Sequence, residues 1–133
     1  MINPNEFRLG NYLLQKINTR ILPVRCGSEH FASMSSPGLK DLFPLVLKPE
    51  YLQKAGFAEN PDYPLLPEAR EFRLLLPVMG SQKTEILAYI KNNKECFARA
   101  VVNGLPASNN IYHLHQLQNL YFSLTGEELA LAL

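Results

Sequence analysis

Two closely spaced histidines, His113 and His115, are the side chains of this sequence best suited to bind a metal ion or to transfer a proton. Their spacing would put both on one side of a strand, but about 200° apart on a helix. Helical zinc pairs use three- or four-residue spacing, as in HExxH. His30 and Cys26 would complete a site only if folding happened to bring them together. The pattern therefore indicates no metal or cofactor site.

Nucleophilic catalysis has equally little support in the sequence. Cys26, Cys96 and the serines lack a local motif such as GxSxG, and no carboxylate pair suggests acid–base chemistry. The seven glycines are isolated, so no loop is built to hold a phosphate. Two distant cysteines are too few for a disulfide framework and fit buried, reduced thiols in a cytoplasmic protein. We expect neither an enzyme nor an identifiable small-molecule substrate, although a small metal-binding or enzymatic protein remains an alternative.

The least charged part of the chain is residues 100–126, which contain no Asp, Glu, Lys or Arg, although 19% of all residues are charged. On a helix, the apolar side chains of this segment fall on one arc. They are Leu114, Leu117, Leu120, Tyr121 and Leu124. The other side carries a candidate interaction face of His115, Gln118, Asn119 and Phe122.

Two interpretations of this uncharged face remain open. Interfaces are depleted in charge and enriched in aromatic residues, so the face suits a protein partner, and homodimerisation needs only one such surface. Alternatively, the helix lies inside the domain, and its amides bond to the backbone of neighbouring strands and turns.

A second candidate surface is basic. Between Phe7 and Ser28 the only charges are positive, on Arg8, Lys16, Arg20 and Arg25. With nearby aromatic rings they would form a face that contacts phosphates and stacks bases. The alternative is four solvated cations that protect edge strands from aggregation. The net charge of +1 gives no global case for nucleic acid or for an anionic membrane.

Short strands dominate the expected structure of the first third. Turn residues separate candidate strands at residues 7–14, with a bend at Gly10, at residues 20–25 and at residues 30–34. The run SSPG at residues 35–38 ends this region, because Gly and Pro favour backbone angles that strands and helices do not use.

A short helix is expected at residues 49–55. Pro49 suits the first helical position, and Gly56 suits the left-handed residue after the last turn. Three prolines in residues 60–67 then indicate an extended joint. The chain fits one domain, residues 1–133, with possible sub-units at residues 1–47 and 48–133.

The second half alternates between strand and helix signals. A strand is expected at residues 71–78, and a hairpin of residues 84–91 and 95–102 is favoured over one helix at residues 81–102. Asn109 or Asn110 would cap a last helix that ends before Gly126. Residues 127–133 alternate in the manner of a closing edge strand.

Three segments carry a resemblance to a known family. HQLQNLYFSLTGEEL, at residues 115–129, resembles a motif of small uncharacterised Bacteroidetes proteins, many from prophage or mobile-element neighbourhoods. Residues 6–12 are similar to that family's LRIGNYV segment, and residues 47–57 to its LTEEWLLKFGF helix. Lys48 and Tyr51 depart from the Thr and Trp of that helix. The resemblance assigns nothing to residues 58–108 and implies no activity.

The sequence thus predicts an α+β protein with a small, barrel-like antiparallel unit, a short central helix, further antiparallel strands and a C-terminal helix packed on the sheet. Absence of a signal peptide and of a membrane-length apolar run favours the cytoplasm. We expect a non-enzymatic accessory or adaptor protein of mobile-element origin that acts through its C-terminal helix. The alternative is a nucleic-acid-associated module that uses the basic strands.

Overall fold

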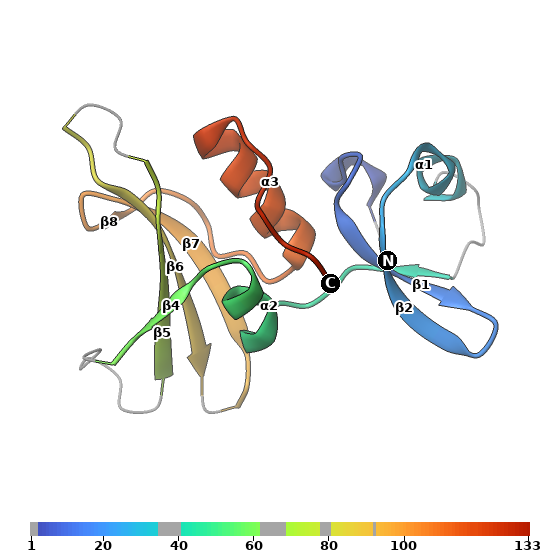
Figure 1. The fold of residues 1–133 in the computed structure, drawn as a ribbon, viewed down its shortest axis with the longest axis horizontal. Helices are drawn as coiled ribbons and strands as arrows, with labels where there is room; N and C mark the ends of the chain where they lie inside the picture. The colour runs from blue at the N-terminus through green and yellow to red at the C-terminus, as the bar shows by residue number, and fades with distance from the viewer. Residues whose placement is uncertain (1–2, 35–40, 62–68, 78–80, 92) are drawn as a thin grey trace.

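Two antiparallel sheets with a helix between them make up the computed structural model, which describes residues 3–34, 41–61, 69–77, 81–91 and 93–133 (Figure 1). The order of strands is β2-β1-β3 in one sheet and β4-β5-β6-β7-β8 in the other. The elements are η1 (Pro4–Glu6), β1 (Tyr12–Ile17), β2 (Arg20–Arg25), α1 (Ser28–Met34), β3 (Leu42–Phe43), α2 (Pro49–Lys54), β4 (Ala58–Asn60), β5 (Ala69–Leu75), β6 (Thr84–Lys91), β7 (Cys96–Val102), β8 (Leu105–Pro106) and α3 (Leu114–Thr125). This architecture confirms the predicted α+β class.

The main core lies between the five-stranded sheet and its two covering helices. Phe72, Ile86, Leu52 and Leu117 are buried there, from β5, β6, α2 and α3. Tyr12 of β1 belongs to the same cluster, so the three-stranded sheet shares this core. A smaller cluster inside the N-terminal sheet contains Phe7, Leu13, Cys26 and Leu42. The predicted sub-unit of residues 1–47 contributes to both clusters, and the division into sub-units stays a prediction.

Several elements form where local sequence signals predict them. Helix α2 begins at Pro49 and is followed by Gly56, whose φ of 92° is the left-handed angle that suits glycine. The favoured hairpin is also confirmed, because β6 and β7 pair along their length from Thr84↔Val102 to Ile90↔Cys96. The run at residues 35–38 and most of the predicted joint at residues 60–67 lie outside the described residues.

The strand predicted at residues 30–34 is wrong, because this segment belongs to helix α1. Phe31 and Met34 are three residues apart, a spacing that puts both on one side of a helix. In α1 they pack against the smaller core cluster. The His30 ring is buried and accepts a hydrogen bond from the Gly27 N–H at 2.8 Å.

The kinked strand predicted at residues 7–14 forms only from Tyr12 onward. Before it, Arg8 and Asn11 close a turn: the Asn11 N–H donates to the Arg8 carbonyl at 3.1 Å, and the Arg8 N–H donates to Asn11 Oδ1 at 2.7 Å. Gly10 has a φ of 88° within this turn. Phe7 therefore leaves the sheet and is free to pack elsewhere.

The last helix starts later than the predicted caps at Asn109 and Asn110. Its N-cap is His113, because the preceding residues pair with other segments first. Ile111 exchanges two backbone hydrogen bonds with Ala98, and the Leu47 N–H donates to the Tyr112 carbonyl at 2.9 Å. The predicted end is confirmed at Gly126, with a φ of 74°.

The C-terminal tail forms no strand, contrary to the prediction for residues 127–133. Leu129 and Leu131 are nevertheless buried in the main core. The tail is held by hydrogen bonds from side chains and not by pairing with a strand. Tyr12 Oη and Arg25 Nη2 each donate to the Leu131 carbonyl at 3.2 Å. Among the described helices, none is long and apolar enough to cross a bilayer.

Candidate functional site

Helix α3 has two differently occupied faces. Leu114 and Leu117 are completely buried, and Leu120, Tyr121 and Leu124 pack against the same core. This confirms that the leucine arc is a core face. Figure 1 shows the opposite face turned toward the N-terminal part of the chain.

The start of the uncharged face is filled by the chain's own N-terminal segment. The rings of Phe7 and His115 stack with centroids 3.9 Å apart and planes 16° apart. Glu6 Oε2 lies 3.4 Å from His115 Nε2, and the histidine is only 1% exposed. Its Nδ1 has no hydrogen-bond partner among the described residues. Burial holds the pKa of His115 below its ordinary value, although hydrogen bonding to Glu6 opposes the shift.

The two amides of this face bond to the same segment. Gln118 Oε1 accepts from the Tyr12 N–H at 2.8 Å, and Gln118 is buried. Asn119 Nδ2 donates to the Glu6 carbonyl at 2.7 Å. The neutral amide of Gln118 satisfies a buried backbone donor, where a charged side chain would lose its hydration, whereas the Asn119 bond is at an exposed position. The absence of charge on this side of α3 is therefore explained by contacts within the chain.

Arg8 joins the two surfaces that the sequence suggested separately. Its Nε donates to Asn119 Oδ1 at 2.7 Å, and its Nη1 bonds Glu128 Oε1 at 2.6 Å. The guanidinium carbon lies 4.3 Å from the centre of the Phe122 ring. Arg8 also lowers the pKa of Glu128, chiefly through this hydrogen bond. One residue of the predicted basic face thus lies on the predicted interaction face.

The other three cations do not share one face with Arg8. Arg25 lies over the Tyr12 ring at 4.6 Å and bonds the carbonyls of Gly10 and Leu131. Register places Lys16 opposite Ile21, and Arg20 opposite Ile17. Because adjacent residues of a strand point to opposite sides, Lys16 and Arg20 project from different faces of the β1–β2 hairpin.

The histidines and cysteines do not form a reactive centre. The rings of His113 and His115 are 5.8 Å apart, and the described residues contain no group of three or more His, Cys, Asp or Glu placed to hold a metal. Both cysteines are buried and free of disulfides. Burial raises the pKa of Cys96 to about 11, and burial with the Glu29 charge raises that of Cys26. Both thiols are therefore protonated and poorly nucleophilic at neutral pH.

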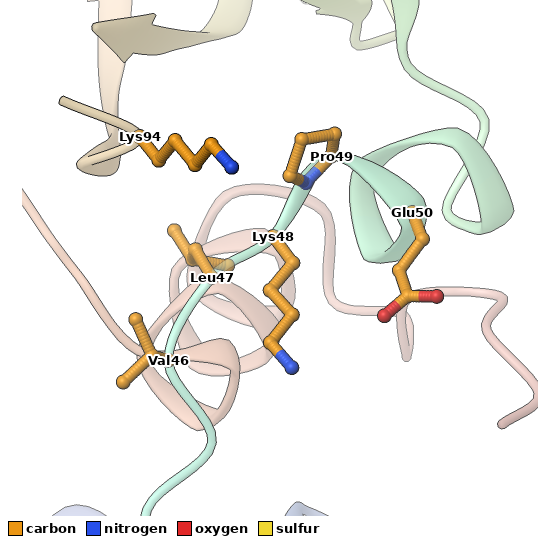
Figure 2. A pocket seen from close by; sticks show the side chains of 6 residues that line it. All are labelled: Val46, Leu47, Lys48, Pro49, Glu50 and Lys94. Carbon is orange, nitrogen blue, oxygen red and sulfur yellow. The ribbon is translucent and has the colours of Figure 1, made fainter. Parts of the chain in front are cut away.

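A pocket that the sequence did not suggest lies where the chain enters α2 (Figure 2). It has a volume of about 510 Å³ and is lined by Val46, Leu47, Lys48, Pro49, Glu50 and Lys94. Lys94 comes from the turn between β6 and β7 and extends toward Pro49, whereas the Lys48 ammonium points away from that ring. The lining combines the apolar side chains of Val46, Leu47 and Pro49 with two lysine amines and one carboxylate. Lys94 is distant in sequence from the other lining residues, at positions 46–50, so tertiary structure is needed to bring it to the pocket.

Tyr12 offers a direct test of the contact between the tail and the three-stranded sheet. Its Oη donates to the Leu131 carbonyl and accepts from the Leu133 N–H, both at 3.2 Å. Tyr12→Phe is expected to reduce the free energy of unfolding by about 1 kcal/mol, since it removes both bonds. Amide hydrogen exchange at Leu133 should accelerate. Unchanged exchange there would show that Tyr12 does not hold the tail.

Comparisons of the chain with protein-family models, with curated proteins and with solved structures found no match.

Proposed function

We propose that this is a non-enzymatic accessory or adaptor protein of the cytoplasm, of mobile-element origin, that acts through protein–protein contacts at its C-terminal helix. The observation that supports it is an exposed patch where α3 meets the N-terminal segment. Phe122 is 38% exposed beneath the Arg8 guanidinium, and Leu9, which follows Arg8 in the sequence, is 64% exposed. We call Arg8, Leu9 and Phe122 the Arg8–Phe122 surface.

This surface is smaller than the four-residue face expected from the sequence. His115 and Gln118 are buried against residues 6–12, so they position the segment and do not meet a partner themselves. Asn119 and Glu128 orient Arg8 from two sides. Arginine and aromatic side chains are enriched among the residues that dominate binding energy, and a pre-oriented arginine loses less entropy on binding.

The partner is either another protein or a second copy of this chain. A second copy would use the same surface on both subunits, with one Arg8–Phe122 surface packed against the other. Light scattering over a range of concentrations separates these two cases.

Phe122→Asp is expected to weaken partner binding or self-association at least tenfold, because it replaces the exposed ring by a hydrated charge. The fold should persist, since Phe122 is exposed. Ser123→Asp is the matched control, as it adds the same charge at the next exposed helical position. Affinity capture and light scattering of both variants give the measurement. The proposal would be rejected if the wild type is a monomer and Phe122→Asp captures the same proteins as Ser123→Asp.

The alternative, a nucleic-acid-associated module on Arg8, Lys16, Arg20 and Arg25, has less support. Arg8 and Arg25 bond to groups of the chain itself, although Arg25 is exposed, as are Lys16 and Arg20. Salt-sensitive binding of DNA or RNA that is lost in Lys16→Ala/Arg20→Ala would favour it.

A further inference from the structure

The free edge of the three-stranded sheet is unusually apolar for a surface strand. Within the described part of the chain, strand β2 pairs with β1 on one side only, and its residues read Arg-Ile-Leu-Pro-Val-Arg. Ile21 is 55% exposed and Leu22 is 42% exposed. The exposed Ile17 of β1 extends the apolar area, whereas the exposed Phe43 belongs to β3, at the opposite edge of the sheet. Isolated exposed apolar side chains are common, but Ile21 and Leu22 together with Ile17 of the paired strand lie on one hairpin, which indicates a contact surface.

The apolar side chains occupy both faces of this edge. Register places Leu22 opposite Gln15, on the same face as Ile17, whereas Ile21 lies opposite Lys16 on the other face. Phe43 lies opposite Leu14 and therefore shares the face of Ile21. An occupant that covers only one face of the sheet would leave half of these side chains in water.

Pro23 argues against a partner strand at this edge. The Lys16 N–H donates to the Asp41 carbonyl at 2.8 Å and so points away from β2. Ile21 is paired with Lys16, so the N–H and C=O of Ile21 point away from β1, toward the free edge. Backbone direction alternates along a strand, so the backbone of Pro23, two residues later, points the same way. Proline has no N–H to donate, so a continuous ladder with an added strand is interrupted at its middle.

The charges within the β1–β2 hairpin are all positive. Arg20 and Arg25 stand at the two ends of β2, Lys16 is on the adjacent strand, and the hairpin of residues 12–25 has no acidic residue. Asp41 is the acidic residue that register places beside Lys16. In Figure 1 the hairpin projects from the body of the molecule, at the end opposite the five-stranded sheet.

We propose that the β2 edge docks on an anionic lipid surface, with Ile21, Leu22 and Ile17 inserted at the headgroup boundary. Lipid surrounds both faces of an inserted edge and would therefore cover Ile21 and Leu22 together. Arg20 and Lys16 reach anionic headgroups from opposite faces of the hairpin, and their aliphatic stems extend the inserted area. Nucleic acid is a poorer fit, since bases stack on aromatic rings and this edge is aliphatic.

Flotation with vesicles of phosphatidylcholine alone, or with about 30% phosphatidylglycerol, tests the proposal directly. The protein is expected to bind the anionic vesicles, less at high salt, and to bind the neutral vesicles weakly. Ile21→Asp should reduce binding roughly tenfold, the effect of withdrawing one inserted aliphatic side chain. Arg20→Gln should reduce it about fivefold.

Leu105→Asp is the matched control, because Leu105 is 70% exposed on β8, the edge strand of the other sheet. It adds the same charge and should leave vesicle binding unchanged, and circular dichroism checks that all variants are folded. Absence of binding to anionic vesicles at low salt overturns the proposal, as does an equal loss in Leu105→Asp. Oligonucleotide binding that needs Arg20 but not Ile21, with no vesicle binding, would assign the edge to nucleic acid instead.

Discussion

Replacing Gln118 with methionine is expected to lower the free energy of unfolding by roughly 2–3 kcal/mol, the cost of leaving a buried backbone donor unpaired. Gln118 Oε1 accepts from the Tyr12 N–H at 2.8 Å, and both residues are buried between α3 and β1. Methionine fills a similar volume but is a weak acceptor. The loss therefore reports the hydrogen bond and not a cavity.

Urea denaturation followed by circular dichroism measures this change. Gln53→Met is the control, because Gln53 is exposed on α2 and its replacement should alter stability by less than about 0.5 kcal/mol. Amide exchange at Tyr12 should also accelerate in Gln118→Met. Equal stabilities of the two variants would mean that the contact between α3 and the N-terminal segment contributes little to folding.

Local signals in the sequence predict the elements that depend on few neighbours. Pro49 and Gly56 bound α2 because each suits one special backbone position. The spacing of Leu114 and Leu117 identifies the buried side of α3 because helical periodicity alone decides which side chains share a face.

The occupant of the other face of α3 depends on contacts between distant parts of the chain. Arg8 meets Glu128, and Tyr12 meets Gln118, more than a hundred residues apart in each case. Periodicity shows that this face differs from the core face, but it cannot show which segment covers it. For the same reason, the sequence predicts two separate surfaces, although the Arg8 guanidinium lies over the Phe122 ring.

The errors in secondary structure have a similar origin. Residues 111–113 are held extended by Ala98 and Leu47, so α3 starts after them despite the favourable caps at Asn109 and Asn110. Leu129 and Leu131 alternate as a strand would, but the tail binds Tyr12 and the core instead of a sheet edge. Tertiary contacts decide between local alternatives that the sequence leaves close in energy.

Acidification is expected to destabilise the protein through His115. Burial lowers its pKa in the folded state, so below the ordinary value of about 6.5 the unfolded chain binds a proton that the folded chain resists. Stability is therefore unaffected by this group at higher pH and falls as the pH drops below that value. One proton can contribute a slope of at most about 1.4 kcal/mol per pH unit.

The groups around His115 set the direction of this effect. Glu6 faces its Nε2 from the N-terminal segment and favours the charged ring, whereas His113 on the same helix opposes it. Phe7 covers the ring and removes it from water, which is the larger influence. Protonation would place a charge between Phe7 and the core. Detachment of the N-terminal segment from α3 would expose the charged ring to water. Loss of this segment would also free Arg8 from Asn119 and so dismantle the Arg8–Phe122 surface.

Urea midpoints of the wild type and of His115→Phe between pH 7.5 and 5 test this argument. Phenylalanine retains a ring against Phe7 but cannot bind a proton, so the variant should lose less stability on acidification than the wild type. An NMR titration of the His115 ring should give a pKa below 6.5, the ordinary value for histidine. Parallel pH profiles for the two proteins would show that the docked segment does not respond to protonation of His115.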